Sequence, residues 1–189
     1  MDAAHKWDDF YTSDSRESFL HFTNDQIASI LRHFPLAKTA LDIGCGEGQL
    51  MLQLEAANIT TIGIDLSKIA LAEARKHVKG NLIEGDFEKF YFPIEQKFDL
   101  IFVKFVIAFM SDIPSFFKKI DDLLNPGGGF ILLAPVSNQP IDRNIEADEI
   151  FIEQSVLDIS MPKYFSNIRE EILHAENEKK LSLFICSKD

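Results

Sequence analysis

A glycine-rich turn and three acidic residues are the parts of this sequence whose types and spacing suggest chemistry. The turn is Asp42-Ile43-Gly44-Cys45-Gly46-Glu47-Gly48, and it follows a short apolar segment. Because glycine has no side chain and tolerates positive φ, such a turn lets the backbone approach a ligand closely, and the amides that begin the next helix attract anions. A tight turn that binds nothing has the same pattern, so the turn alone is a weak signal.

The acidic residues stand where successive predicted strands end: Asp42, Asp65 and Asp86. In a parallel α/β sheet those ends share one edge, so we expect the three carboxylates in one cleft. Asp65 follows the turn at the separation, about twenty residues, at which an acid binds a ribose. Asp65 is also close to the start of the next helix, where Ser67 is a good N-cap, and the two roles are compatible.

Three carboxylates in one partly buried cleft repel each other unless a ligand offsets them. S-adenosylmethionine (SAM) carries a sulfonium, an ammonium, a ribose diol and an adenine amino group, whereas NAD carries a pyrophosphate that Asp42 and Glu47 would repel. The acids therefore favour SAM. An oxidoreductase that binds NAD(P) at the same turn is the alternative, and a non-catalytic SAM-binding domain is a third possibility.

The elements that must position these residues alternate between strand and helix. An apolar stripe at Ile27, Ile30, Leu31 and Phe34 predicts a first amphipathic helix that ends before Pro35. Strands are then predicted at 40–43, 60–64, 81–84, 98–103, 130–134, 168–174 and 181–186, and helices at 49–57, 68–78, 113–124 and 147–157. This alternation predicts an α/β fold with parallel strands, and the short link between the last two strands favours an antiparallel hairpin.

Composition narrows the class of protein. The 189 residues carry a formal net charge of -11, which opposes binding to nucleic acid. Cys45 and Cys186 are the only cysteines, so no disulfide framework is expected. We find neither a signal peptide nor an apolar run long enough for a membrane span, and we expect a cytoplasmic protein without a membrane partner.

The motifs together resemble those of class I SAM-dependent methyltransferases, in particular the small methyltransferase-domain type that acts on metabolites. The resemblance starts near Lys38 and reaches the C-terminus. It is carried by the motifs Ala40-Leu41-Asp42-Ile43-Gly44-Cys45-Gly46-Glu47-Gly48, Gly63-Ile64-Asp65-Leu66-Ser67, Gly85-Asp86-Phe87, Phe98-Asp99-Leu100-Ile101 and Leu124-Asn125-Pro126-Gly127-Gly128-Gly129-Phe130. It implies a Rossmann-like, doubly wound, mostly parallel seven-stranded sheet in a single domain, with an antiparallel last strand.

The resemblance also implies the roles of individual residues. Asp65 would hold the ribose hydroxyls and Asp86 the adenine amino group, with Leu66 and Phe87 beside the adenine ring. The methionine part of SAM would lie among the residues of the turn, namely Asp42, Gly44, Cys45, Gly46 and Gly48. Val103 and Lys104, at the end of the fourth strand, would close over the SAM amino group and methyl group.

The N-terminal segment resembles one that folds over SAM in several small-substrate relatives. We therefore expect residues 1–36 to form a helical cap over the SAM site of a methyltransferase domain at 37–189. Trp7 and Tyr11 are candidate substrate-side residues, although they could equally pack this helix onto the body, and His21 is a weak candidate. The acid pairs Asp8-Asp9 and Asp121-Asp122 are interpreted as solvated surface.

The segment after the fourth strand departs from the family pattern. Ala108 and Phe109 stand where many relatives carry a polar residue and then a histidine or tryptophan, so no catalytic base is assigned. Most phenylalanines nearby are expected to be core, but Phe105 and Phe109 are candidates for an apolar wall against a small acceptor. The histidines lack metal-ligand spacing, and no metal is expected.

Overall fold

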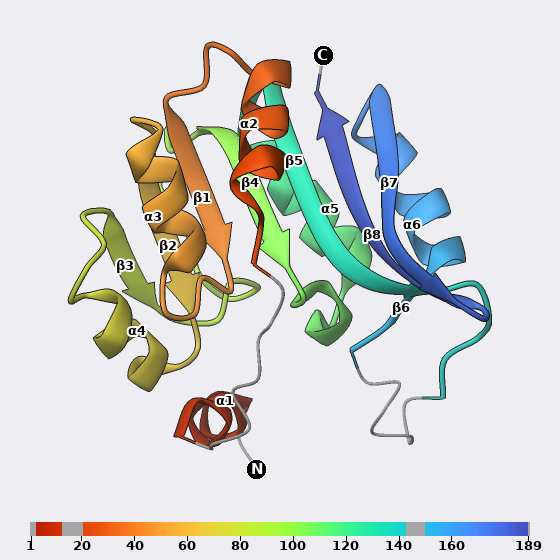
Figure 1. The fold of residues 1–189 in the computed structure, drawn as a ribbon, viewed down its shortest axis with the longest axis horizontal. Coiled ribbons are helices and arrows are strands. Elements are labelled where there is room, and N and C mark those ends of the chain that lie inside the picture. Colours follow the sequence, from red (N-terminus) through yellow and green to blue (C-terminus); the bar gives the residue numbers. More distant parts are fainter. Residues whose placement is uncertain (1–2, 13–20, 143–149, 189) are drawn as a thin grey trace. The chain divides into compact units, whose positions relative to one another are not determined.

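The computed structural model describes residues 3–12, 21–142 and 150–188 of the chain (Figure 1). These divide into two compact units, Met1–Pro93 and Ile94–Asp189. Each unit is described by itself below. Among the described residues, every helix is too short or too polar to cross a membrane.

The N-terminal unit is built on three parallel strands in the order β3-β2-β1. They are β1 (Thr39–Ile43), β2 (Thr60–Asp65) and β3 (Asn81–Glu84). The connecting helices are α3 (Gln49–Ala56), which packs on β1 and β2, and α4 (Lys68–Ala74), which packs on β2 and β3. Parallel strands need such crossovers, and the crossovers bring the three strand ends to one edge.

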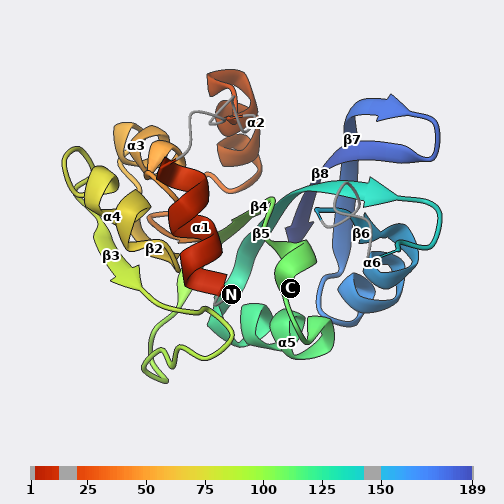
Figure 2. The same cartoon turned by 90° about the horizontal axis from the view of Figure 1, so that it is seen from below.

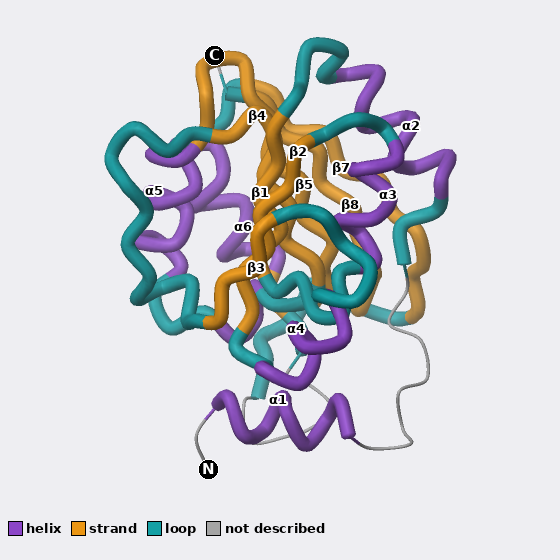
Figure 3. Tube along the Cα trace, turned by 90° about the vertical axis from the view of Figure 1, so that its left-hand side faces the viewer, coloured by secondary structure: helices purple, strands orange, loops and turns teal. Residues whose placement is uncertain are grey.

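Two further helices precede β1. The helix α2 (Asn24–His33) starts with a capping box, in which Thr23 and Gln26 satisfy each other's backbone amides, and it buries Ile27 and Ile30. The helix α1 (Ala3–Thr12) lies beside α4, as the views in Figures 2 and 3 both show. The helix α1 therefore lies close to the segment that follows β2 and leads into α4.

The C-terminal unit combines parallel and antiparallel pairing. The strand β4 (Phe98–Lys104) runs parallel to β5 (Leu124–Ser137), β5 pairs antiparallel with β8 (Lys179–Ser187), and β8 pairs antiparallel with β7 (Asn167–Glu176). The two-residue β6 (Ile152–Glu153) adds to the far end of β5. The helical parts are η1 (Ile107–Phe109), α5 (Ile113–Leu123), α6 (Gln154–Ser160) and η3 (Met161–Lys163).

The predicted mixed α/β class, with parallel strands and an antiparallel C-terminal hairpin, is confirmed. All seven predicted strands are present, and the described residues add the short β6. The predicted helix at 147–157 is wrong in part, because 152–153 pair with β5 and the helix begins at Gln154; residues 147–149 lie outside the described residues. The strand predicted at 130–134 is longer than expected, because β5 begins at Leu124 and the glycine-rich residues after it form an irregular start where the register with β4 shifts.

Candidate functional site

The glycine turn follows β1 and takes a backbone path that side chains disfavour. Gly44, Gly46 and Gly48 have φ values of 72°, 52° and 80°, and Gly48 is the left-handed N-cap of α3. L-residues with a Cβ rarely adopt these angles, so the path depends on glycine at these positions. The sequence prediction of a tight strand-to-helix turn is confirmed.

The amides of this turn are used inside the protein. Gly44 and Cys45 donate to the carbonyl of Ile64 at 2.8 and 3.2 Å, Gly48 donates to the carbonyl of Cys45 at 2.9 Å, and Gly46 donates to Asp65 Oδ2 at 2.8 Å. A pyrophosphate binds such a turn through amides that point at it. Because these four amides already have acceptors, they are not available to a pyrophosphate.

The space beside two of the glycines is filled by the protein's own side chains. A Cβ at Gly46 would lie 2.3 Å from the hydroxyl of Tyr11, and one at Gly48 would lie 2.7 Å from Cγ1 of Val78. Gly48 therefore permits the packing of the turn against the end of α4 rather than the approach of a ligand. Sequence reasoning missed both contacts, since nothing local connects the turn to Val78.

Asp65 is fixed at the mouth of the turn by both of its oxygens. Oδ1 accepts the amide of Ser67 and Oδ2 accepts the amide of Gly46, each at 2.8 Å. Burial raises the pKa of Asp65, and these two amides oppose the rise. Each carboxylate oxygen can accept a second hydrogen bond, so a held Asp65 can still receive two hydroxyl donors.

Asp86 follows the end of β3. The backbone there lies beside that of Asp65, because the amide of Gly85 donates to the Asp65 carbonyl at 2.9 Å. Its Oδ1 accepts the amide of Glu88 at 2.9 Å, and its Oδ2 pairs with Lys89 Nζ at 2.7 Å. Lys89 is largely exposed, so the pair is weak in water. Phe87, only 4% exposed, packs near Phe92, which leaves its backbone rather than its ring for a ligand.

Tyr11 of α1 reaches this group of acids. Its half-buried hydroxyl contacts Gly46, and burial, followed by the charges of Asp65, Cys45, Glu47 and Asp42, raises its pKa above the ordinary value. The hydroxyl thus stays protonated and is a donor among acceptors. Trp7 is on the same helix, with its ring 6.0 Å from that of Phe10.

The other turn-side residues are placed as follows. Asp42 is buried, and burial, followed by the charges of Asp42 and Asp65, raises the pKa of the Cys45 thiol well above its ordinary value. Leu66 is half-buried between Asp65 and Ser67, and His21 is exposed. The acids therefore surround a thiol that stays neutral and unreactive.

Asp8 corrects one interpretation of the sequence. Its Oδ1 accepts the hydroxyl of Ser67 at 2.7 Å and the amide of Ile69 at 3.3 Å, so Asp8 is not a solvated surface acid. The Asp121-Asp122 pair is also engaged, because Asp121 pairs with Lys188 and Asp122 with Lys118. The sequence separation of Asp8 and Ser67 explains why local patterns gave no signal.

The candidates in the C-terminal unit follow the end of β4. Val103 is fully buried, so only its backbone is available, while Lys104, Phe105 and Phe109 are half-buried. Phe105 has φ 61°, a left-handed conformation that is strained for an aromatic residue, and its amide donates to the Leu133 carbonyl at 2.9 Å. Such strain is held where the surroundings fix it, and it clusters at functional sites.

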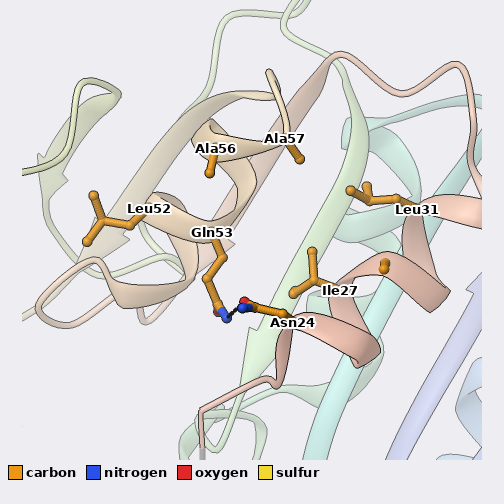
Figure 4. Close-up of a pocket in the computed structure, with 8 residues that line it drawn as sticks. Asn24, Ile27, Leu31, Leu52, Gln53, Ala56 and Ala57 are labelled. Atoms are coloured by element: carbon orange, nitrogen blue, oxygen red, sulfur yellow. Dashed lines mark hydrogen bonds between the residues drawn. The ribbon is translucent and has the colours of Figure 1, made fainter.

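A separate groove of about 450 Å³ lies between α2 and α3 (Figure 4). Within it Gln53 Nε2 donates to Asn24 Oδ1 at 3.2 Å. Its walls are formed by Asn24, Ile27, Ala28, Leu31, Leu52, Gln53, Ala56 and Ala57. Because no charged side chain lines it, the groove does not suit the cationic ligand that the acids favour.

Comparison with known proteins decides the family. A family model described as "Methyltransferase domain" matches residues 37–179, which is more than half of the chain. The chain belongs to this family. Among the described residues, no group of three or more acidic, histidine or cysteine side chains is arranged to hold a metal ion.

The individual relatives are longer than this chain. The ubiquinone biosynthesis O-methyltransferase of Aromatoleum aromaticum is 33% identical over 151 residues, which are 76% of this chain and 61% of that protein. The mitochondrial arginine-hydroxylase NDUFAF5 of Rattus norvegicus is 34% identical over 116 residues, 57% of this chain and 31% of that protein. This methyltransferase domain thus spans less than two thirds of these curated relatives.

Solved structures share the fold. The N-terminal domain of EvdMO1 with SAH bound superposes with a TM-score of 0.73 at 15% identity, over 93% of this chain and 84% of that one. TehB from Haemophilus influenzae gives 0.69 at 17% identity, over 96% of this chain and 67% of that one. At these identities the likeness establishes the Rossmann-like methyltransferase fold of the chain and nothing finer.

Proposed function

We propose that this methyltransferase domain binds SAM at the glycine turn and transfers its methyl group to a small-molecule acceptor. The observation that carries the proposal is the carboxylate of Asp65, held between the amides of Gly46 and Ser67 beside a turn four of whose amides are occupied. That arrangement offers acceptors to a ribose and few donors to a phosphate.

The residues present fit the chemistry of such a cofactor. Asp65 would accept hydrogen bonds from the two ribose hydroxyls, and Asp86, which now pairs with the exposed Lys89, would accept one from the adenine amino group. The negative charges of Asp42, Glu47 and Asp65 around Tyr11 favour a cationic ligand, while the Tyr11 hydroxyl is positioned to donate to that ligand's carboxylate. Leu66 and the Phe87 backbone would flank the adenine base.

Bound SAM would supply a methyl group that is already activated by the sulfonium. The task of the protein is then to hold the acceptor in line with that methyl group and to exclude water. Val103 and Lys104 would close over the SAM amino group and methyl group, and the strained Phe105 and Phe109 are the residues that we assign to the acceptor side. An acceptor that arrives as a nucleophile needs no general base.

The domain assignment is part of this proposal. Residues 1–36 are assigned to a cap for the site and residues 37–189 to the methyltransferase domain; residues 1–2 and 13–20 of the cap lie outside the described residues, and the contact between Tyr11 and Gly46 supports the cap. A cytoplasmic location and a lack of nucleic-acid partners are also proposed. The two cysteines, Cys45 and Cys186, are not joined in a disulfide, which supports the location, and the net charge of -11 supports a small acceptor over a polyanion.

Two measurements test the function. Calorimetric titration should show heat of binding for SAM and for its demethylated product, and none for NAD or NADP. Incubation with methyl-labelled SAM and fractionated small metabolites should transfer label to at least one fraction. Binding of NAD in preference to SAM would overturn the cofactor assignment, and SAM binding without transfer to any acceptor would favour a non-catalytic SAM-binding domain.

A further inference from the structure

One face of α1 contacts both turns that border the proposed cofactor cleft. Asp8 and Tyr11 are three residues apart, so they lie on the same side of the helix. Asp8 contacts the turn between β2 and α4, and Tyr11 contacts the turn between β1 and α3. The helix therefore bridges the two segments that hold Asp65.

The contact of Asp8 is a charge-assisted hydrogen bond. Asp8 Oδ1 accepts from Ser67 Oγ at 2.7 Å and from the Ile69 amide at 3.3 Å, and the bond to Ser67 is the main reason that the pKa of Asp8 lies below its ordinary value. Ser67 is fully buried, and its Oγ also accepts the Ala70 amide as the N-cap of α4. The single proton of the Ser67 hydroxyl is therefore donated to Asp8, while its oxygen caps α4.

The same two turns fix the proposed ribose acid. The Ser67 amide donates to Asp65 Oδ1, and the Gly46 amide donates to Asp65 Oδ2. Asp8 and Tyr11 thus act on the two residues that orient Asp65. A change in how α1 docks is transmitted to this carboxylate through one hydrogen bond on each side.

Docking matters because α1 has little stability of its own. It has ten residues, and isolated helices of that length are marginal in water. Its packing within this unit consists mainly of contacts with α4, in addition to the contact of Tyr11 with Gly46. Loss of the Asp8 bond should therefore free the helix rather than leave it docked elsewhere.

We propose that Asp8 is a positioning residue, a latch that holds α1 against the cofactor cleft and thereby sets the rate at which the cofactor leaves. This inference rests on the proposed function. Asp8 touches no cofactor itself; it acts through Ser67 on the helix and on Asp65. Cofactor release requires the Asp8–Ser67 bond to open first.

Asp8→Ala tests the latch, with Asp9→Ala as the matched control, since Asp9 is an exposed neighbour on the same helix. Stopped-flow displacement of SAH from the full chain should show release about tenfold faster for Asp8→Ala, as expected for loss of a hydrogen bond to a charged group, and unchanged for Asp9→Ala. Asp8→Asn keeps an acceptor oxygen and should restore slow release in large part.

Trp7 allows docking to be measured without any ligand, because it is the single tryptophan of the chain and lies on α1. Acrylamide should quench Trp7 more strongly in Asp8→Ala than in the wild type or in Asp9→Ala. Circular dichroism checks that each variant is folded. If Asp8→Ala does not fold, the same measurements are made on Asp8→Asn.

The outcomes separate the latch from the function. If the wild type binds SAM but Asp8→Ala matches Asp9→Ala in both release rate and quenching, the latch is wrong and the function stands. If the wild type binds no SAM, the proposed function is wrong. The role of Asp8 in cofactor release is then wrong too, even where quenching shows that Asp8 docks α1. Faster release together with stronger quenching supports the latch.

Discussion

The two units of the chain differ in where their polar contacts and their apolar contacts are found. In the N-terminal unit the short strands β1, β2 and β3 end in turns that hydrogen-bond to each other, since Asp65 accepts the Gly46 amide and Gly85 donates to the Asp65 carbonyl. In the C-terminal unit β5 is long and is buried after its first four residues. The rings of Phe117 and Phe165 pack against Phe130 of this strand. The residues that we propose for cofactor binding therefore lie at the ends of short strands, and the aromatic core of the C-terminal unit lies on its longest strand.

The largest expected effect is on the stability of the C-terminal unit. Phe130 is fully buried, and its ring stacks on Phe165 at 5.3 Å and contacts Phe117 at 5.8 Å. Phe130→Ala should lower the free energy of unfolding by about 3–5 kcal/mol, measured by urea denaturation. At a temperature where the variant is folded, its Kd for SAM should be unchanged; weaker SAM binding at undiminished stability would break the comparison.

A glycine in each unit provides a sharper contrast. Gly46 and Gly127 both have positive φ, but a Cβ at Gly46 meets the Tyr11 hydroxyl, whereas nothing lies within 4 Å of one at Gly127. Gly127→Ala should cost about 1–2 kcal/mol from the backbone alone. Gly46→Ala should cost more, and the excess should shrink when Tyr11→Ala is added. Equal costs in urea denaturation would mean that Tyr11 does not press on the turn.

The pH dependence of SAM binding distinguishes the acids of the N-terminal unit. Because burial raises the pKa of Asp65, the folded protein protonates this group more readily than the unfolded chain does, so its ionised form opposes folding and the penalty disappears at low pH. Ribose binding needs the ionised form. SAM affinity should therefore decline with falling pH before an ordinary aspartate of pKa about 3.9 would titrate.

Asp65→Asn supplies the control for that profile. The amide cannot ionise, so calorimetry across the same pH range should give weak binding that changes much less with pH. A wild-type profile that stays flat until the protein unfolds would show that Asp65 does not carry the pH dependence.

The smallest effect expected is at surface turns, where the two units should behave alike. Asn58 and Asn177 are exposed residues with φ of 62° and 54°, one in each unit. Since asparagine tolerates this conformation, Asn58→Gly and Asn177→Gly should each change the unfolding free energy by less than about 0.5 kcal/mol. A change well above that in either one would place unrecognised strain in its unit.

The parts predicted from sequence are those governed by local periodicity. Apolar runs and glycine positions indicated the strands, the turn and the C-terminal hairpin, and the order of strands brought Asp65 beside the turn. The bond from Asp8 to Ser67 and the pressure of Tyr11 on Gly46 were not predictable, because each joins residues far apart in the chain. The left-handed Phe105 was also missed, since a bulky residue gives no sign of that conformation.

The start of α6 shows a further limit. Residues 152–153 fit a helical pattern in sequence, yet their backbone pairs with β5, and only the position of that long strand makes the pairing available. Tertiary contacts override local preference in such short segments.

The central claim is that Asp65 holds the ribose of SAM, and calorimetric titration of SAM into Asp65→Ala tests it most directly. Glu73→Ala, which removes an acid of α4 that pairs with the exposed Lys76, is the matched control. Loss of a charge-assisted contact of about 1.5–3 kcal/mol predicts that Asp65→Ala weakens SAM binding more than tenfold while Glu73→Ala leaves it unchanged. Wild-type affinity in a folded Asp65→Ala variant would contradict the account.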